Sequence, residues 1–99
     1  MPRFFKEKPL KKTTLEVLGK DFDRICEKWK IKEELREKLK KLIKLWDETM
    51  KIKDMIERTI KKLEIATDII KEIDEKERGN FISCLEELMD EFYKKAVTH

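Results

Sequence analysis

The middle of the chain constrains the fold most, because no glycine or proline occurs from residue 20 to residue 78. In a helix interior, glycine costs about 1 kcal/mol and proline about 3 kcal/mol relative to alanine. Apolar residues recur along the chain at spacings of three and four, which is the period of a helix. No segment shows the period of two that a half-buried strand requires. The sequence therefore predicts an all-α fold.

The length of the middle segment, residues 31–77, raises the question of whether it forms one helix or two. A single helix would be about 70 Å long, whereas a globular chain of this length has a radius of gyration near 13 Å. The apolar stripe also turns by roughly 130° between residues 35–50 and 52–73, far more than supercoiling explains. We predict a joint within residues 47–54, with Asp54–Glu57 as a capping box for the restart. One continuous helix is the alternative.

The remaining helix ends are predicted from capping residues and glycines. Thr13 and Glu16 form a capping box at the start of a first helix that reaches Trp29 and passes through Gly19. Arg78-Gly79-Asn80 is expected to be the last joint, with Asn80 as the N-cap of the final helix. The sequence thus predicts a small bundle of four helices, or three if the middle segment is continuous, as one domain over residues 13–99.

Residues 1–12 are expected to form a basic extended arm, because Pro2 and Pro9 disfavour helix there. The arm carries a net charge of +4, against +3 for the whole chain. Within the helical part, residues 28–44 have a net charge of +5 and residues 71–91 one of −5. Either these two segments face each other or simply face water, or the basic helix and the arm contact a polyanion. We favour the first interpretation, because it needs no outside partner.

Nucleic-acid binding is the alternative function that this charge distribution suggests. Aromatic rings among positive charges are typical of single-strand binders, and the arm offers both. The final helix is too acidic to enter a DNA groove, which argues against a helix-turn-helix. The candidate contacts for a polyanion are Arg3, Phe4, Phe5, Lys6, Lys8, Lys11 and Lys12 in the arm, and Lys32, Arg36 and Lys40 in the basic helix.

Enzyme chemistry and metal binding have little support in the sequence. The one histidine, His99, is the last residue, where chains fray. Two glycines are too few for a phosphate-binding loop. The cysteines lack the CxxC spacing and the internal histidines of a zinc site. We therefore expect no catalytic residues, no cofactor, no metal and no small-molecule substrate.

Cys26 and Cys84 fall on or beside the apolar faces of the first and last helices. Both are expected to be small buried side chains. A disulfide between them is the alternative, and it requires the two helices to be adjacent, with Cα atoms within about 7 Å. Intracellular proteins of hyperthermophilic archaea do use disulfides.

The polar composition predicts a hyperthermophilic source. Glutamine is absent, asparagine and serine occur once each, and lysine and glutamate dominate the charges. No apolar run is long enough to span a bilayer, and the amino terminus has no signal-peptide core, so an intracellular, cytoplasmic location is expected. In its length, its composition and its start, MPRFFKEKPLKKTT, the chain resembles small proteins of filamentous viruses of hyperthermophilic archaea. That resemblance implies a heat-stable viral protein in the host cytoplasm and implies no site residues.

The expected function is a heat-stable scaffold or protein-interaction protein, acting as a dimer or with another protein. Met50, Ile52, Met55 and Ile65 spread the apolar surface of the middle segment over more than one face. An apolar surface on several faces of a short helix often marks an interface.

Overall fold

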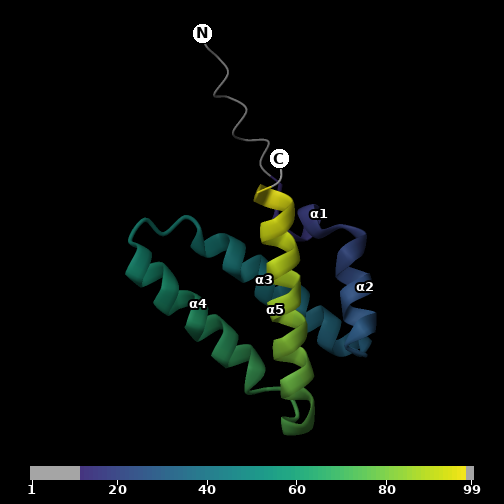
Figure 1. The fold of residues 1–99 in the computed structure, drawn as a ribbon. Coiled ribbons are helices and arrows are strands. Elements are labelled where there is room, and N and C mark those ends of the chain that lie inside the picture. Colours follow the sequence, from purple (N-terminus) through teal and green to yellow (C-terminus); the bar gives the residue numbers. More distant parts are fainter. Residues whose placement is uncertain (1–11, 98–99) are drawn as a thin grey trace.

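The computed structural model describes residues 12–97 and shows five α-helices and no strand within that range (Figure 1). The all-α prediction is confirmed, although the number of helices is five where four or three were expected. Of the expected arm, only Lys12 belongs to the described residues. The helices are α1 (Thr14–Leu18), α2 (Lys20–Lys28), α3 (Glu33–Thr49), α4 (Met55–Ile70) and α5 (Glu75–Val97).

The first predicted helix begins as expected but is divided at Gly19. The capping box is present, since Glu16 N donates to Thr13 Oγ1 at 3.2 Å and Thr13 N donates to Glu16 Oε1 at 2.9 Å. Continuity through Gly19 is wrong, because this residue has φ 53° and ψ −127°. Only glycine enters that region without strain. The chain therefore turns at Gly19, and α1 and α2 form two short helices.

The joint predicted within residues 47–54 is confirmed. Helix α3 ends at Thr49 and α4 begins at Met55. Asp54 is the N-cap of α4, and its Oδ1 accepts a hydrogen bond from Ile56 N at 3.0 Å. The two helices run back along each other as a hairpin (Figure 1). The described part measures 54 × 30 × 19 Å, which has no room for a 70 Å rod.

The last predicted joint is misplaced, because α5 runs through Gly79 and Asn80 without a break. The turn lies earlier, between Ile70 and Glu75. Gly79 keeps a negative φ, and a Cβ added there would meet nothing within 4 Å. The helix therefore tolerates this glycine at a cost of about 1 kcal/mol, and no left-handed cap forms.

An arginine near the start of each of the last three helices binds the turn that precedes it. In each case the guanidinium is on the fourth residue of the helix and donates to the carbonyl of an isoleucine in the turn. These bonds satisfy backbone acceptors where the chain changes direction beside the core. The pairs are Arg36 with Ile31 O (3.0 Å), Arg58 with Ile52 O (3.1 and 2.9 Å) and Arg78 with Ile73 O (2.8 Å).

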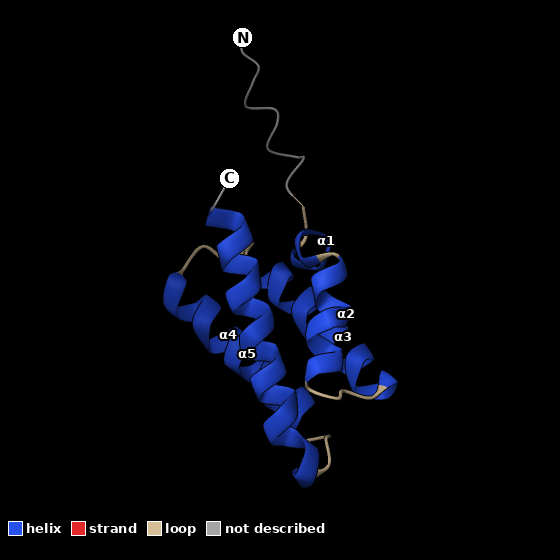
Figure 2. Ribbon diagram, turned by 45° about the vertical axis from the view of Figure 1, so that its right-hand side comes forward, coloured by secondary structure: helices blue, strands red, loops and turns tan. Residues whose placement is uncertain are grey.

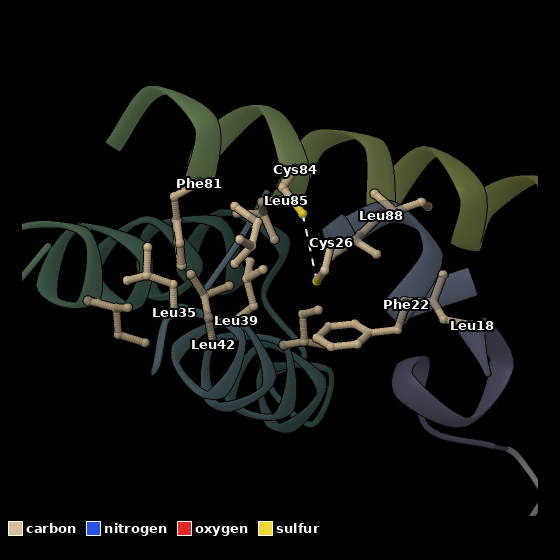
Figure 3. Close-up of a cluster of buried hydrophobic side chains, with 14 of the residues drawn as sticks. Leu18, Phe22, Cys26, Leu35, Leu39, Leu42, Phe81, Cys84, Leu85 and Leu88 are labelled. Atoms are coloured by element: carbon tan, nitrogen blue, oxygen red, sulfur yellow. Dashed lines mark hydrogen bonds between the residues drawn. The ribbon is translucent and has the colours of Figure 1, made fainter. Parts of the chain in front are cut away.

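The core lies between α2, α3 and α5, with α1 closing one end (Figures 2 and 3). Phe81, Leu39 and Leu88 are completely buried in it. Helix α4 is the outer member of the fold. It packs mainly on α3, and Ile69 is its one buried side chain. This arrangement leaves much of α4 facing away from the core.

Candidate interaction surface

The basic segment 28–44 lies against the acidic segment 71–91, as the first interpretation of the charge pattern predicted. Three ion pairs join the two segments across different helices or turns. Each brings an ammonium group within hydrogen-bonding range of a carboxylate. They are Lys28–Glu87 (2.9 Å), Lys32–Glu77 (2.7 Å) and Lys38–Glu72 (3.3 Å). Three of the eight basic side chains in residues 28–44 are therefore paired with the acidic segment.

The pKa shifts in these pairs follow from the same contacts. Lys28 and the Trp29 indole N–H both donate to Glu87, which lowers the pKa of that carboxyl. The hydrogen bond to Glu77 raises the pKa of Lys32. Both groups are accessible to solvent, so these pairs align α2 and the start of α3 with α5 more than they add stability.

Each of the candidate polyanion contacts in the basic helix lies near a carboxylate of the same molecule. Lys32 is paired with Glu77. Arg36 is half-buried and lies 3.5 Å from a carboxylate oxygen of Asp23. Lys40 has Glu37 at 3.7 Å and stands over the Phe22 ring. Lys12 is exposed, and Arg3, Phe4, Phe5, Lys6, Lys8 and Lys11 lie outside the described residues.

One surface hollow lies where α3 faces the turn before α5. It has a volume of about 610 Å³. Its rim mixes lysines with carboxylates, among them Lys38, Lys41, Glu34 and Asp74. Small-molecule sites are mostly apolar clefts with a few convergent polar groups, whereas this hollow is lined mainly by charged side chains.

Within residues 12–97, no group of three or more histidine, cysteine or acidic side chains could hold a metal ion. None of the helices in that range has the length and apolar content needed to cross a membrane.

Cys26 of α2 and Cys84 of α5 meet in the core, so the adjacency that a disulfide requires is present (Figure 3). Both side chains are fully buried and their sulfur atoms are 4.0 Å apart. The cysteines are not bonded to each other. The Cys84 thiol donates to Cys26, which lowers the pKa of Cys26 and raises the pKa of Cys84. The disulfide itself stays a prediction.

The main exposed apolar surface of the described residues lies on α4. Ile56, Ile60 and Leu63 are 71%, 52% and 63% exposed. Their spacings of four and three place them on one side of the helix, which we call the outer α4 face. Met50 and Met55, at the turn that leads into α4, are 62% and 69% exposed. Exposed apolar side chains therefore occur both at this turn and on the outer α4 face.

The prediction of which residues form an exposed apolar surface is only partly correct. Met50 and Met55 are exposed, whereas Ile52 and Ile65 are half-buried. The outer α4 face was missed because its residues were assigned to a single apolar stripe over residues 52–73, whereas the buried residue of α4 is Ile69. Ile56 and Leu63 lie more than 100° around the helix from Ile69 at 100° per residue. The sequence did contain a signal for this face, because apolar residues occur on opposite sides of the same helix and only one side can pack on the core.

The outer α4 face is not flat. A shallow hollow of about 290 Å³ is lined by Ile60, Leu63, Glu64, Thr67 and Asp68. The indole N–H of Trp46 donates to Lys62 O at 3.0 Å, and the Lys62 ammonium lies 4.7 Å from the centre of the Trp46 ring. These contacts anchor the opposite side of α4 on α3 and so fix the direction in which the hollow points.

No family model, curated protein or solved structure shows significant similarity to this chain. Its function must accordingly be inferred from its own surface and interior.

Proposed function

We propose that this protein is a non-enzymatic, heat-stable helical scaffold that binds another protein molecule through the outer α4 face. The observation that carries the proposal is the exposure of Ile56, Ile60 and Leu63, each more than half accessible, on a helix packed mainly on α3. The other helices direct their large apolar side chains into the core far more completely.

The cost of this exposure supports an interaction role. Burying a leucine or isoleucine side chain stabilises a protein by about 1.5–3 kcal/mol relative to leaving it in water. Three such residues on one side of α4 are therefore largely without this stabilisation in the isolated chain, and a partner that covers them would supply it. Contiguous apolar surface rimmed by polar residues is typical of protein–protein contacts, and a helix that presents it is a common recognition element.

The rigidity of the surface also favours binding. Trp46 and Lys62 hold the middle of α4 in one orientation on α3. Arg58 attaches its first turn to Ile52 O. A surface that is already ordered loses little conformational entropy when a partner docks.

The proposal can be tested by site-specific photo-crosslinking of the purified full chain, alone and in extracts of its source organism. A photoreactive side chain replaces Ile60 in one sample and Val97 in the other. Val97 is the matched control, because it is apolar and 79% exposed but lies on α5. We expect discrete protein adducts from position 60 and not from position 97. Equal yields from both positions would overturn the proposal.

A further inference from the structure

We infer that the partner on the outer α4 face is a second copy of this chain, whose α4 packs antiparallel in a twofold-symmetric dimer. This inference rests on the proposed function and specifies its partner. It depends on three features of α4: the shape of the hollow, the spacing of the apolar residues and the balance of charge.

The hollow is shallow, and four of its lining residues occupy the positions that form the socket for one side chain of a facing helix. Ile60, Leu63, Glu64 and Thr67 are at positions i, i+3, i+4 and i+7, and all four line it. In helix pairs that pack knobs into holes, four residues at this spacing surround each inserted side chain. This spacing therefore suits a partner helix laid along α4.

The spacing of the residues on this face makes α4 complementary to itself. Ile56, Ile60, Leu63 and Thr67 follow one another at intervals of four, three and four residues. This order is the same in both directions, so an antiparallel copy has the same pattern opposite it. Ile60 then faces the partner's Leu63, and Ile56 faces the partner's Thr67.

In this register each copy supplies both the side chain and the socket. The socket is centred between Leu63 and Glu64, and the partner residue opposite that point is Ile60. The twofold axis repeats the contact, so Ile60 of the first copy enters the socket of the second. Such an isologous contact closes the assembly at two chains.

Charge balance supports a copy of the chain over a highly charged partner. Residues 53–71 hold five basic and four acidic side chains. Two such segments can approach each other without strong repulsion, whereas a polyanion would find no complementary surface there. The segments 28–44 and 71–91 could not pair with their own copies in this way, since their net charges are +5 and −5.

The stoichiometry is tested by sedimentation of the full chain over a range of concentrations. We expect a species of twice the chain mass of 12.1 kDa. Ile60→Asp should weaken association by about 10-fold or more, because it places a charge in the socket. Val97→Asp should leave association unchanged. Circular dichroism confirms that both variants keep their helix content.

The orientation is tested with Ile56→Cys and Thr67→Cys, oxidised by glutathione disulfide, which is reduced to two glutathione molecules for each bond formed. The inference predicts cross-linked dimers when the two variants are mixed and far fewer when either is oxidised alone. Preferential cross-linking of Ile56→Cys with itself would indicate a parallel pair and overturn the inference. A monomer that still forms adducts at position 60 with a different protein would also overturn it, and would leave the proposed function intact. A monomer without such adducts would overturn both.

Discussion

The sulfur atoms of Cys26 and Cys84 lie 4.0 Å apart in the centre of the core, although the two residues are separated by 58 positions in the chain. Cys26 belongs to α2 and Cys84 to α5, and both are fully buried. Their small side chains allow the two helices to approach closely. This contact therefore ties an early part of the chain to its last helix.

The first prediction is that glutathione disulfide converts this pair into an intramolecular disulfide. Thiol–disulfide exchange needs access to a thiolate. We expect oxidation to be slow in the native protein and much faster in partially denaturing urea. The oxidised protein should lose two hydrogens by mass spectrometry. Its free energy of unfolding should rise by up to about 4 kcal/mol, since the closed loop is long.

Cys26→Ala is the control for this experiment, because it leaves one thiol and cannot form the intramolecular bond. Mixed disulfides with glutathione as the only product from the unsubstituted chain would contradict the prediction. Such a result would show that α2 and α5 cannot move the sulfur atoms into bonding distance.

The second prediction contrasts the two glycines. Gly19→Ala should destabilise the protein by about 1–3 kcal/mol, because residue 19 has φ 53° and ψ −127°, where a Cβ causes strain. Gly79→Ala should stabilise it by about 0.5–1 kcal/mol, because residue 79 is helical and a Cβ there meets nothing. Urea denaturation of the two variants and the parent chain measures both changes. The same sign for both substitutions would show that one of these backbone conformations is wrong.

These glycines also show how much of the fold the sequence could predict. The helical period of the apolar residues was sufficient to predict the all-α fold. The rotation of the apolar stripe around the helix axis was sufficient to predict the joint before Met55. The two glycines were interpreted the wrong way round, because a glycine permits a turn without requiring one. Whether the chain turns there depends on tertiary packing, such as that of Phe81, which has no local signature.

The surface was harder to predict than the fold for a related reason. The charge totals of residues 28–44 and 71–91 were sufficient to suggest that these segments meet, and three ion pairs join them. The exposure of Ile60 and Leu63 was not predicted, because an apolar residue on a helix is usually buried. Only the arrangement of α3 and α4 shows which side of α4 is covered.

The third prediction concerns the arginines that hold the turns. Arg78 Nε donates to Ile73 O at 2.8 Å, and its Nη2 donates to Lys71 O at 3.1 Å. Arg78→Ala should cost about 1–2 kcal/mol, and Arg78→Lys should recover little of it, because an ammonium cannot reproduce the forked geometry. Lys76 lies in the same first turn of α5 as Arg78 and is exposed. The control substitution Lys76→Ala should therefore change the free energy of unfolding by less than about 0.5 kcal/mol. Full recovery by lysine in thermal or urea unfolding would mean that charge alone is sufficient.

The fourth prediction is that acid weakens the contact between α2 and α5. The pKa of Glu87 is lowered by Lys28 and Trp29, and that of Asp21 by Lys95 and Arg24. A carboxyl group with a lowered pKa stabilises the fold above its unfolded pKa and loses that contribution as the pH falls through its folded pKa. The Glu87→Gln variant should therefore be less stable than the parent chain above about pH 5. The two proteins should have nearly the same stability at about pH 2, where Glu87 is protonated. Urea midpoints measured between about pH 2 and pH 7 test this, and added salt should narrow the difference at neutral pH. If the difference in urea midpoint between the two proteins stays constant across this pH range, the substitution acts through packing. The charge of Glu87 then contributes nothing to stability.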